Sequence, residues 1–153
     1  MSSATTTMSS RSVGSARDSL RLAAIDVGSN SVHMVVAQAD GCAPIVRAFA
    51  AGETKAIPWE NPTTHASGLR VPGPLGDRLI LRALRESNGE AHAVSEDAIR
   101  EGTLKLSRAS GVDAAPEGGC ALAVTEQLLA VGKIPRDAEV LVFNTGSGAS
   151  YRF

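Results

Sequence analysis

The chain has 153 residues, enough for one domain with a buried core, and 43% of them are hydrophobic. Fifteen Lys and Arg against 16 Asp and Glu leave a formal net charge of −1, and 3% aromatic content without a basic stripe argues against nucleic-acid binding. The three histidines and two cysteines match no zinc spacing, and no apolar run approaches the ~20 residues that span a bilayer, so we expect a cytoplasmic protein without metal or membrane contact.

Residues 1–20 are rich in Ser, Thr and Ala, and their first acidic residue is Asp18. This composition predicts a disordered tail, because it offers few side chains that a core could bury. An organelle transit peptide is the alternative, since the segment is poor in acids and contains arginine. A secretory signal is not expected, because the segment has no apolar central region.

Residues 21–36 read as a β-hairpin, with apolar runs on both sides of a polar turn at residues 26–31. Its sequence A-x-D-x-G-S-N-S resembles the first hairpin of the exopolyphosphatase/guanosine pentaphosphatase family. In a phosphate site, the Asp26 carboxylate would hold a metal-bound water and the turn would cradle the phosphate with backbone N–H groups. The residues of this alternative site are Asp26, Gly28, Ser29, Asn30 and Ser31. The other interpretation is an ordinary hairpin, because the chain has no second phosphate loop.

Apolar residues at helical spacing predict four helices after residue 40. Pro44 suits the first turn of one helix, and Ser95 is a typical N-cap residue for another. Gly111 and Gly132 each follow the last periodic residue of a helix. The second helix begins at residues 76–77 and carries one apolar face, formed by Leu79, Ile80, Ala83 and Leu84.

Strands are predicted at residues 91–94, 112–115 and 140–143, where short apolar runs end in turn-forming residues. Their alternation with helices over short connections predicts a parallel three-layer α/β sheet. The last run, Val140-Leu141-Val142-Phe143, is continuously apolar, so we expect a central strand covered on both faces.

Two loops at strand ends are the predicted ligand-binding region, because ligands of open α/β sheets bind at the carboxyl ends of the strands. Residues 116–119 read P-E-G-G and residues 144–148 read N-T-G-S-G. The Glu117 carboxylate and the Thr145 hydroxyl could each contact a nitrogen of a planar heteroaromatic cofactor. Alternatively, Glu117 is a surface or N-capping acid, and residues 144–148 are an ordinary turn.

Five segments occur in one order and at one set of spacings: QADGCAPIVRAF, PWENPTTHASGLRVP, GDRLILRALRES, APEGG and VLVFNTGSG. Together they resemble the C-terminal part of threonine synthase, over residues 37–153. The resemblance implies the fold of the fold-type II pyridoxal-phosphate enzymes, here as a partial three-layer sheet, with pyridoxal phosphate as the cofactor. It implies a lyase that converts the small molecule O-phosphohomoserine into threonine and phosphate.

Five residues are expected to bind the cofactor, and the resemblance implies the positions of three of them. Thr145 would hydrogen-bond the pyridine nitrogen, and Glu117 would lie near the same ring. Ser67, in segment 66–69, would flank the cofactor. Gly146 and Gly148 are expected beside the ligand as well, because glycines let the backbone come close to it.

No catalytic residue is expected in this chain. In the family, the lysine that binds the cofactor covalently follows a serine and precedes an Asp-Arg pair. Lys55, Lys105 and Lys133 lack those neighbours. We therefore expect a truncated fusion, inactive alone and without covalent cofactor attachment. It would consist of a tail (1–20), a phosphatase-like hairpin (21–36) and an incomplete cofactor domain (37–153). A phosphate- or nucleotide-binding fragment and a non-catalytic remnant that self-associates through an exposed sheet edge are the alternatives.

Overall fold

The computed structural model describes residues 23–26 and 32–152, and it describes side chains from His33 onward. The predicted disordered tail lies outside the described residues. So do four residues of the alternative phosphate site, Gly28, Ser29, Asn30 and Ser31, and the side chain of Asp26, whose backbone ends the first strand.

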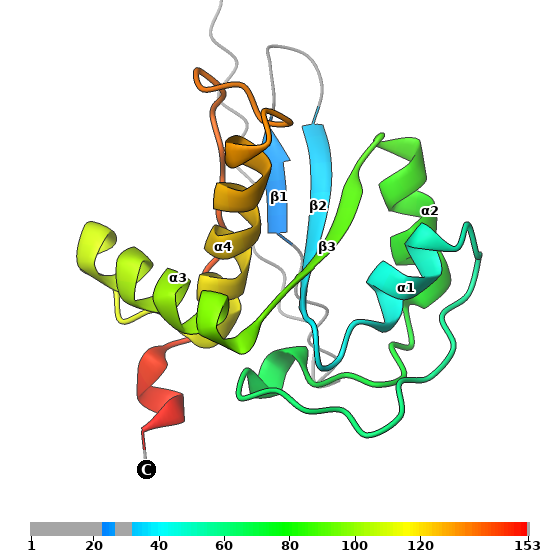
Figure 1. The fold of residues 1–153 in the computed structure, drawn as a ribbon, viewed down its shortest axis with the longest axis horizontal. Coiled ribbons are helices and arrows are strands. Elements are labelled where there is room, and N and C mark those ends of the chain that lie inside the picture. Colours follow the sequence, from blue (N-terminus) through cyan, green and yellow to red (C-terminus); the bar gives the residue numbers. More distant parts are fainter. Residues whose placement is uncertain (1–22, 27–31, 153) are drawn as a thin grey trace, which may run out of the picture.

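A three-stranded sheet in the order β1-β2-β3 forms the middle of the structure (Figure 1). Strands β1 (Ala23–Asp26) and β2 (Val32–Ala39) are antiparallel, as the predicted hairpin requires, with Ala24 opposite Met34. Strand β3 (Glu90–Val94) lies parallel to β2, with Val36 opposite Ala91. Strand β2 runs without a break through the predicted junction at residues 36–37, and that junction stays a prediction.

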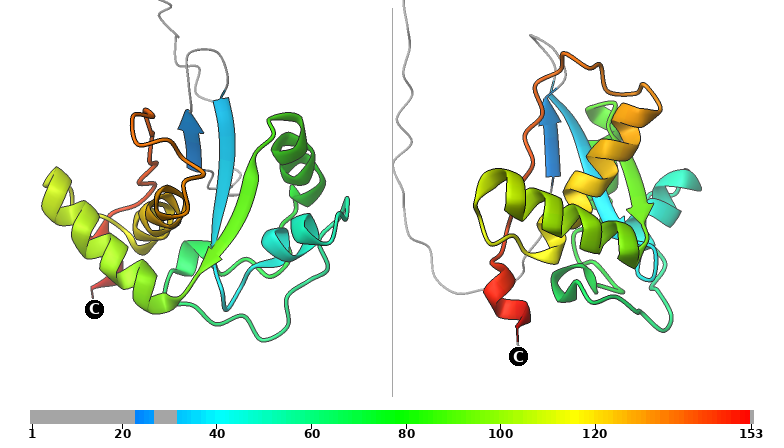
Figure 2. Two further views of the ribbon diagram at one scale, coloured as in Figure 1. Left: turned by 45° about the horizontal axis from the view of Figure 1, so that its top comes forward. Right: turned by 60° about the vertical axis from the view of Figure 1, so that its left-hand side comes forward.

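Helices cover both faces of this sheet and confirm the expected three layers. Helices α1 (Pro44–Ala50) and α2 (Asp77–Glu86) lie on one face. Helices α3 (Glu96–Ser110) and α4 (Pro116–Ala130) lie on the other, and the left view of Figure 2 shows the two pairs on opposite sides of the sheet.

Neighbouring residues of β2 supply the two apolar cores, because successive side chains of a strand point to opposite faces. Val35 belongs to the core beneath α3 and α4, together with Ile99 and Val124. Val36 belongs to the core beneath α1 and α2, together with Ile45, Ile80, Leu81 and Leu84. The α2 face therefore differs from the predicted one: Leu81 is buried, whereas Leu79 is exposed.

Local signals set the ends of α1 and α3 as the sequence predicts. Helix α1 begins at Pro44, and the Gln38 side chain accepts hydrogen bonds from the next two backbone N–H groups of that helix. The Ser95 hydroxyl caps α3 by accepting a hydrogen bond from the Ala98 N–H. Gly111 ends α3 in the left-handed conformation, with φ of 70°, which a residue without a Cβ adopts at little cost.

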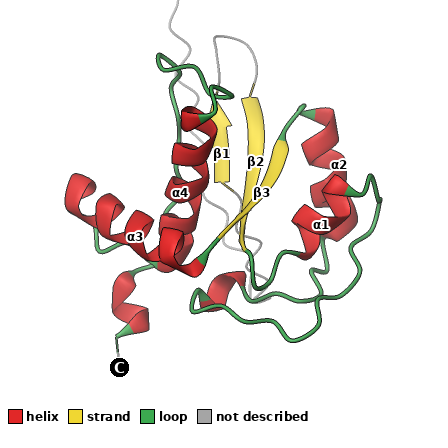
Figure 3. Cartoon of the chain, viewed as in Figure 1, coloured by secondary structure: helices red, strands yellow, loops and turns green. Residues whose placement is uncertain are grey.

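Two of the predicted strands are wrong. Residues 140–143 form no strand, and Leu141 and Phe143 are 55% and 43% exposed instead of central (Figure 3). Residues 112–115 contribute a single bridge, between Ala114 and Ser147. The physical reason is the same for both: a strand needs a hydrogen-bonded neighbour, and the sheet of the described residues consists of β1, β2 and β3 alone.

The predicted loop at residues 116–119 is also wrong, because these residues are the first turn of α4. The glycines there serve helix packing. A Cβ on Gly119 would lie 2.0 Å from Thr103 Oγ1 and 2.5 Å from the Ile99 carbonyl oxygen, and one on Gly102 would lie 2.3 Å from the Gly119 carbonyl oxygen. Helices α3 and α4 therefore cross with their backbones in contact.

Candidate functional site

The Glu117 carboxylate is the centre of a hydrogen-bond network at the start of α4. Its side chain is buried, and its Oε1 accepts a hydrogen bond of 2.8 Å from the Gly68 N–H. The same oxygen accepts a short hydrogen bond from the Tyr151 hydroxyl, which in turn accepts one of 3.1 Å from the Ser67 hydroxyl. Glu117 and Ser67, which the sequence assigns to one site, are therefore joined through Tyr151.

Three separate segments build this network. The 3₁₀ turn η1 (Ser67–Leu69) supplies Ser67 and the Gly68 N–H, α4 supplies Glu117, and the second 3₁₀ turn, η2 (Gly148–Tyr151), supplies Tyr151. Burial raises the pKa of the Tyr151 hydroxyl, and the hydrogen bond to Glu117 raises it further. Tyr151 is therefore neutral near neutral pH and donates its proton to the carboxylate.

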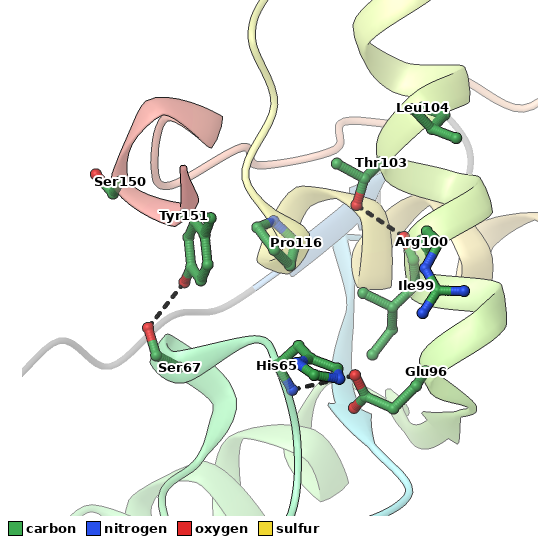
Figure 4. A pocket seen from close by; sticks show the side chains of 10 residues that line it. All are labelled: His65, Ser67, Glu96, Ile99, Arg100, Thr103, Leu104, Pro116, Ser150 and Tyr151. Carbon is green, nitrogen blue, oxygen red and sulfur yellow. Dashed lines mark hydrogen bonds between the residues drawn. The ribbon is translucent and has the colours of Figure 1, made fainter. Parts of the chain in front are cut away.

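A pocket of about 670 Å³ opens beside the network, between α3, η1 and η2 (Figure 4). Its lining combines apolar, hydroxyl and charged side chains, namely His65, Ser67, Glu96, Ile99, Arg100, Thr103, Leu104, Pro116, Ser150 and Tyr151. The Ser67 and Tyr151 hydroxyls meet at one side of it, and the His65 backbone N–H donates a 3.1 Å hydrogen bond to Glu96 at another.

The loop at residues 144–148 is held against the start of α4 by Asn144. Its Oδ1 accepts a hydrogen bond from the Ala115 N–H, and its Nδ2 donates one to the Gly146 carbonyl oxygen. Gly148 is buried and donates its N–H to the Asp113 carbonyl oxygen, and a Cβ there would lie 2.6 Å from Asp113 Oδ1. Thr145 stands exposed between these anchored residues.

Cys120 lies one turn into α4, close enough to Glu117 and Glu96 for their charges to affect the pKa of its thiol. Burial raises the pKa of its thiol to about 12, and the negative charges of Glu117 and Glu96 act in the same direction. The thiol therefore stays protonated and is a poor nucleophile. Both cysteines are buried and free.

The three lysines lie away from this site. Lys105 pairs with Glu126 at 2.9 Å, Lys133 pairs with Glu90 at 2.8 Å, and Lys55 is exposed in the loop after α1. None of them lines the pocket. Thr145 is exposed in a loop that Asn144 holds, and the residues that line the pocket include no lysine to which pyridoxal phosphate could be attached covalently.

Two features of this region are not predicted from the sequence. Tyr151 is 34 residues from Glu117, and its position after the glycine loop gives no sign of a contact with that carboxylate. Glu96 and Arg100 read only as part of a helix in the sequence, although both line the pocket. The available signal is the spacing of Glu96 and Arg100, because residues four positions apart share one face of a helix.

Other site types find no support among the residues the structure describes. Within that part of the chain, no cluster of three or more His, Cys, Asp or Glu side chains is arranged to hold a metal ion. None of its helices combines the length and apolarity that crossing a bilayer requires. The phosphate-loop alternative stays a prediction, because its turn lies outside the described residues.

The family model for pyridoxal-phosphate dependent enzymes matches residues 19–146 of this sequence. This match covers most of the chain, and the chain belongs to that family, as the resemblance predicted. The expected cofactor of the family, pyridoxal phosphate, is thereby confirmed.

Among individual relatives, the threonine synthase of Methanocaldococcus jannaschii is 36% identical over 111 residues, which is 72% of this chain and 27% of that protein. The threonine synthase of Methanosarcina acetivorans is 35% identical over 109 residues, covering 71% of this chain and 27% of that protein. The threonine-synthase resemblance is therefore confirmed. The chain spans about a quarter of the length of these relatives.

Solved structures confirm the expected fold class of fold-type II pyridoxal-phosphate enzymes. The threonine deaminase of T.th. superposes with a TM-score of 0.53 at 27% identity, over 67% of this chain and 35% of that one. Maize serine racemase superposes with a TM-score of 0.51 at 26% identity, over 60% of this chain and 26% of that one.

Proposed function

We propose that this chain forms the ring-binding part of a threonine-synthase-like, pyridoxal-phosphate-dependent lyase site. Thr145 would hydrogen-bond the pyridine nitrogen, with Gly146 and Gly148 beside it, and Glu117 and Ser67 would lie at the edge of the cofactor. When bound, the cofactor supplies an electron sink for chemistry on an amino-acid substrate. The substrate we propose is O-phosphohomoserine, and the products are threonine and phosphate.

The observation that carries this proposal is the convergence of η1, the start of α4 and residues 144–148. Glu117 accepts hydrogen bonds from η1 and from Tyr151, while Asn144 ties the Thr145 loop to Ala115 at the same end of α4. These segments come from three separate parts of the sequence. Their convergence supports a preorganised binding edge, because the Glu117 and Asn144 side chains are each held by two hydrogen bonds.

We further propose that the chain does not catalyse this reaction by itself. The reason is the position of its lysines, since two are engaged in ion pairs elsewhere and the third lies in the loop after α1. Without a lysine beside the ring, the chain has no group to attach the cofactor or to move a proton at the reacting carbon. It would bind pyridoxal phosphate reversibly.

The test measures both binding and turnover with the purified 153-residue chain. Isothermal titration with pyridoxal phosphate should show saturable binding that dialysis reverses, and O-phosphohomoserine should release no phosphate above a protein-free control. Thr145→Val should weaken binding about tenfold, because it removes a hydroxyl while keeping the side-chain shape. Phosphate release by the purified chain would overturn the proposed inactivity.

A hydroxyl in the same loop provides the matched control. The Ser147 side chain accepts a hydrogen bond from the Ala149 N–H, so it is engaged within its own turn. Ser147→Ala should leave the affinity for pyridoxal phosphate unchanged. Equal losses in Thr145→Val and Ser147→Ala would contradict the role assigned to Thr145, and the absence of saturable binding would refute the ring-binding proposal.

A further inference from the structure

The α3 wall of the pocket carries opposite charges one helical turn apart. Glu96 and Arg100 are four residues apart, which places them on the same side of the helix, and both line the pocket. Ile99, Leu104 and Pro116 supply the apolar lining, and Leu104 lies farther from Glu96 along α3 than Ile99 does (Figure 4). The pocket therefore offers an anion, a cation and an apolar surface to one small molecule.

The Glu96 carboxylate has unused acceptor capacity. Its Oε2 accepts one hydrogen bond from the His65 N–H, whereas its Oε1 is buried and has no hydrogen-bond partner among the described residues. An ionised carboxylate can accept about four hydrogen bonds. A buried acceptor without a donor costs free energy, so a donor brought by a ligand would be bound favourably.

In the described part of the chain, Glu96 also lacks a cation that would neutralise its charge. Within residues 33–152, no Lys or Arg side chain forms an ion pair with Glu96. Negative charge already accumulates at this end of α4. Burial is the main cause of the raised pKa of the Cys120 thiol, and the charges of Glu117 and Glu96 raise this pKa further. A primary ammonium group would neutralise this charge and donate up to three hydrogen bonds.

Arg100 is available for a carboxylate. Its guanidinium contacts Asp97 at 3.1 Å, and the two side chains are 67% and 85% exposed. Ion pairs this exposed contribute little, so Arg100 can exchange Asp97 for another anion at small cost. The planar guanidinium then matches a carboxylate in two parallel hydrogen bonds.

We propose that this pocket binds an aliphatic α-amino acid as a zwitterion. Its ammonium group contacts the Glu96 carboxylate, its carboxylate contacts Arg100, and its side chain packs on Ile99, Leu104 and Pro116. The ammonium group forms no covalent bond, because neither a lysine nor a cofactor takes part in this binding. This binding is independent of the proposed function, because the groups that contact the amino acid are not those assigned to the pyridoxal-phosphate ring. Ser67 lines the pocket and is the one residue that the two sites share.

The test uses L-norvaline as the probe, added to the full chain without pyridoxal phosphate and followed by two-dimensional NMR. Saturable shifts are expected for the backbone amides of Glu96, Thr103 and Tyr151, which all line the pocket. n-Butylamine, which lacks the carboxylate, and pentanoate, which lacks the ammonium, should each bind about tenfold more weakly than L-norvaline. If n-butylamine or pentanoate bound as tightly as L-norvaline, the proposal that both charged groups of the amino acid contact the pocket would be overturned.

Variants separate the two charges. Glu96→Gln keeps an acceptor for the His65 N–H but removes the charge, so it should weaken L-norvaline binding about tenfold. Arg100→Gln should weaken it about threefold, because Arg100 lies nearer to solvent. Glu101→Gln and Arg108→Gln, on the same helix but outside the pocket, should bind like the original chain. Unchanged affinity in Glu96→Gln, or no saturable shift at all, would refute the proposal.

Discussion

Two segments that the sequence places side by side at one site differ sharply in how they are held. The start of α4 is packed against α3 in backbone contact, and Glu117 in its first turn is 5% exposed. Residues 139–147 run as an extended segment (Figure 2). Leu141 and Phe143 in this segment are exposed. The contrast teaches that a helix forms its backbone hydrogen bonds within its own residues, whereas a strand needs a neighbouring strand to form them.

The largest effect is expected where the two helices cross. Gly119→Ala should lower the free energy of unfolding by about 3 kcal/mol, because its Cβ would overlap Thr103 Oγ1 and the Ile99 carbonyl oxygen. Urea unfolding followed by circular dichroism measures this change. Gly73→Ala is the control, since no atom lies within 4 Å of its Cβ position, and it should stay within about 0.5 kcal/mol of the original chain.

Removing one hydroxyl should weaken the contact between η2 and α4 by an intermediate amount. Tyr151→Phe removes the donor to Glu117 while keeping the ring, so the free energy of unfolding should fall by about 1.5 kcal/mol. The same urea experiment at neutral pH measures it. An unchanged value would mean that solvent replaces the hydroxyl fully and that η2 does not stabilise Glu117.

The same hydroxyl predicts a dependence on alkaline pH. The pKa of Tyr151 is raised above its ordinary value of 10.0, first by burial and then by Glu117, so its stabilising effect is complete below pH 10 and is lost as the pH rises through the folded-state pKa. Tyr151 is the single tyrosine of the sequence, and tyrosinate absorbance therefore follows it alone. Glu117→Gln should lower this pKa, and a titration identical to that of the original chain would contradict the contact.

A smaller loss is expected from the anchor of the Thr145 loop. Asn144→Ala leaves the Ala115 N–H and the Gly146 carbonyl oxygen without this side-chain partner, and it should cost about 1 kcal/mol. Hydrogen exchange at the Ala115 amide should accelerate in the variant. If that amide stayed protected, the loop would be held by its other contacts, among them the bond from Gly148 to Asp113.

The smallest effect is expected in the extended segment. Leu141→Ser should change the free energy of unfolding by less than about 0.5 kcal/mol, because the leucine already faces water. Val124→Ser, in the core beneath α3 and α4, provides the contrast and should destabilise strongly. A large loss in Leu141→Ser would show that residues 139–147 bury this side chain in solution, as the sequence predicted.

The features that the sequence predicts correctly depend on a few neighbouring residues. Pro44 at the start of α1, Ser95 as the cap of α3 and Gly111 at its end each act within one turn. The β1–β2 hairpin is equally local. These signals do not require knowledge of what lies across the fold.

The errors concern contacts between distant segments. The sequence of residues 116–119 suggested a glycine loop, yet Gly119 is needed because α3 crosses there. Residues 140–143 have the composition of a buried strand, but β1, β2 and β3 leave them without a hydrogen-bonded neighbour. The Tyr151–Glu117 contact and the pocket on α3 likewise arise from tertiary packing, which no local pattern encodes.

One consequence follows from the way β2 serves both cores. Val35 and Val36 point to opposite helical layers, so a slip of β2 by a single residue would exchange their destinations and expose apolar surface in both layers at once. The strand thus has one workable alignment, and neither pair of helices can detach without disturbing the other. Melting should accordingly proceed in a single cooperative transition, with the far-ultraviolet signal and the fluorescence of the lone Trp59 changing at the same temperature.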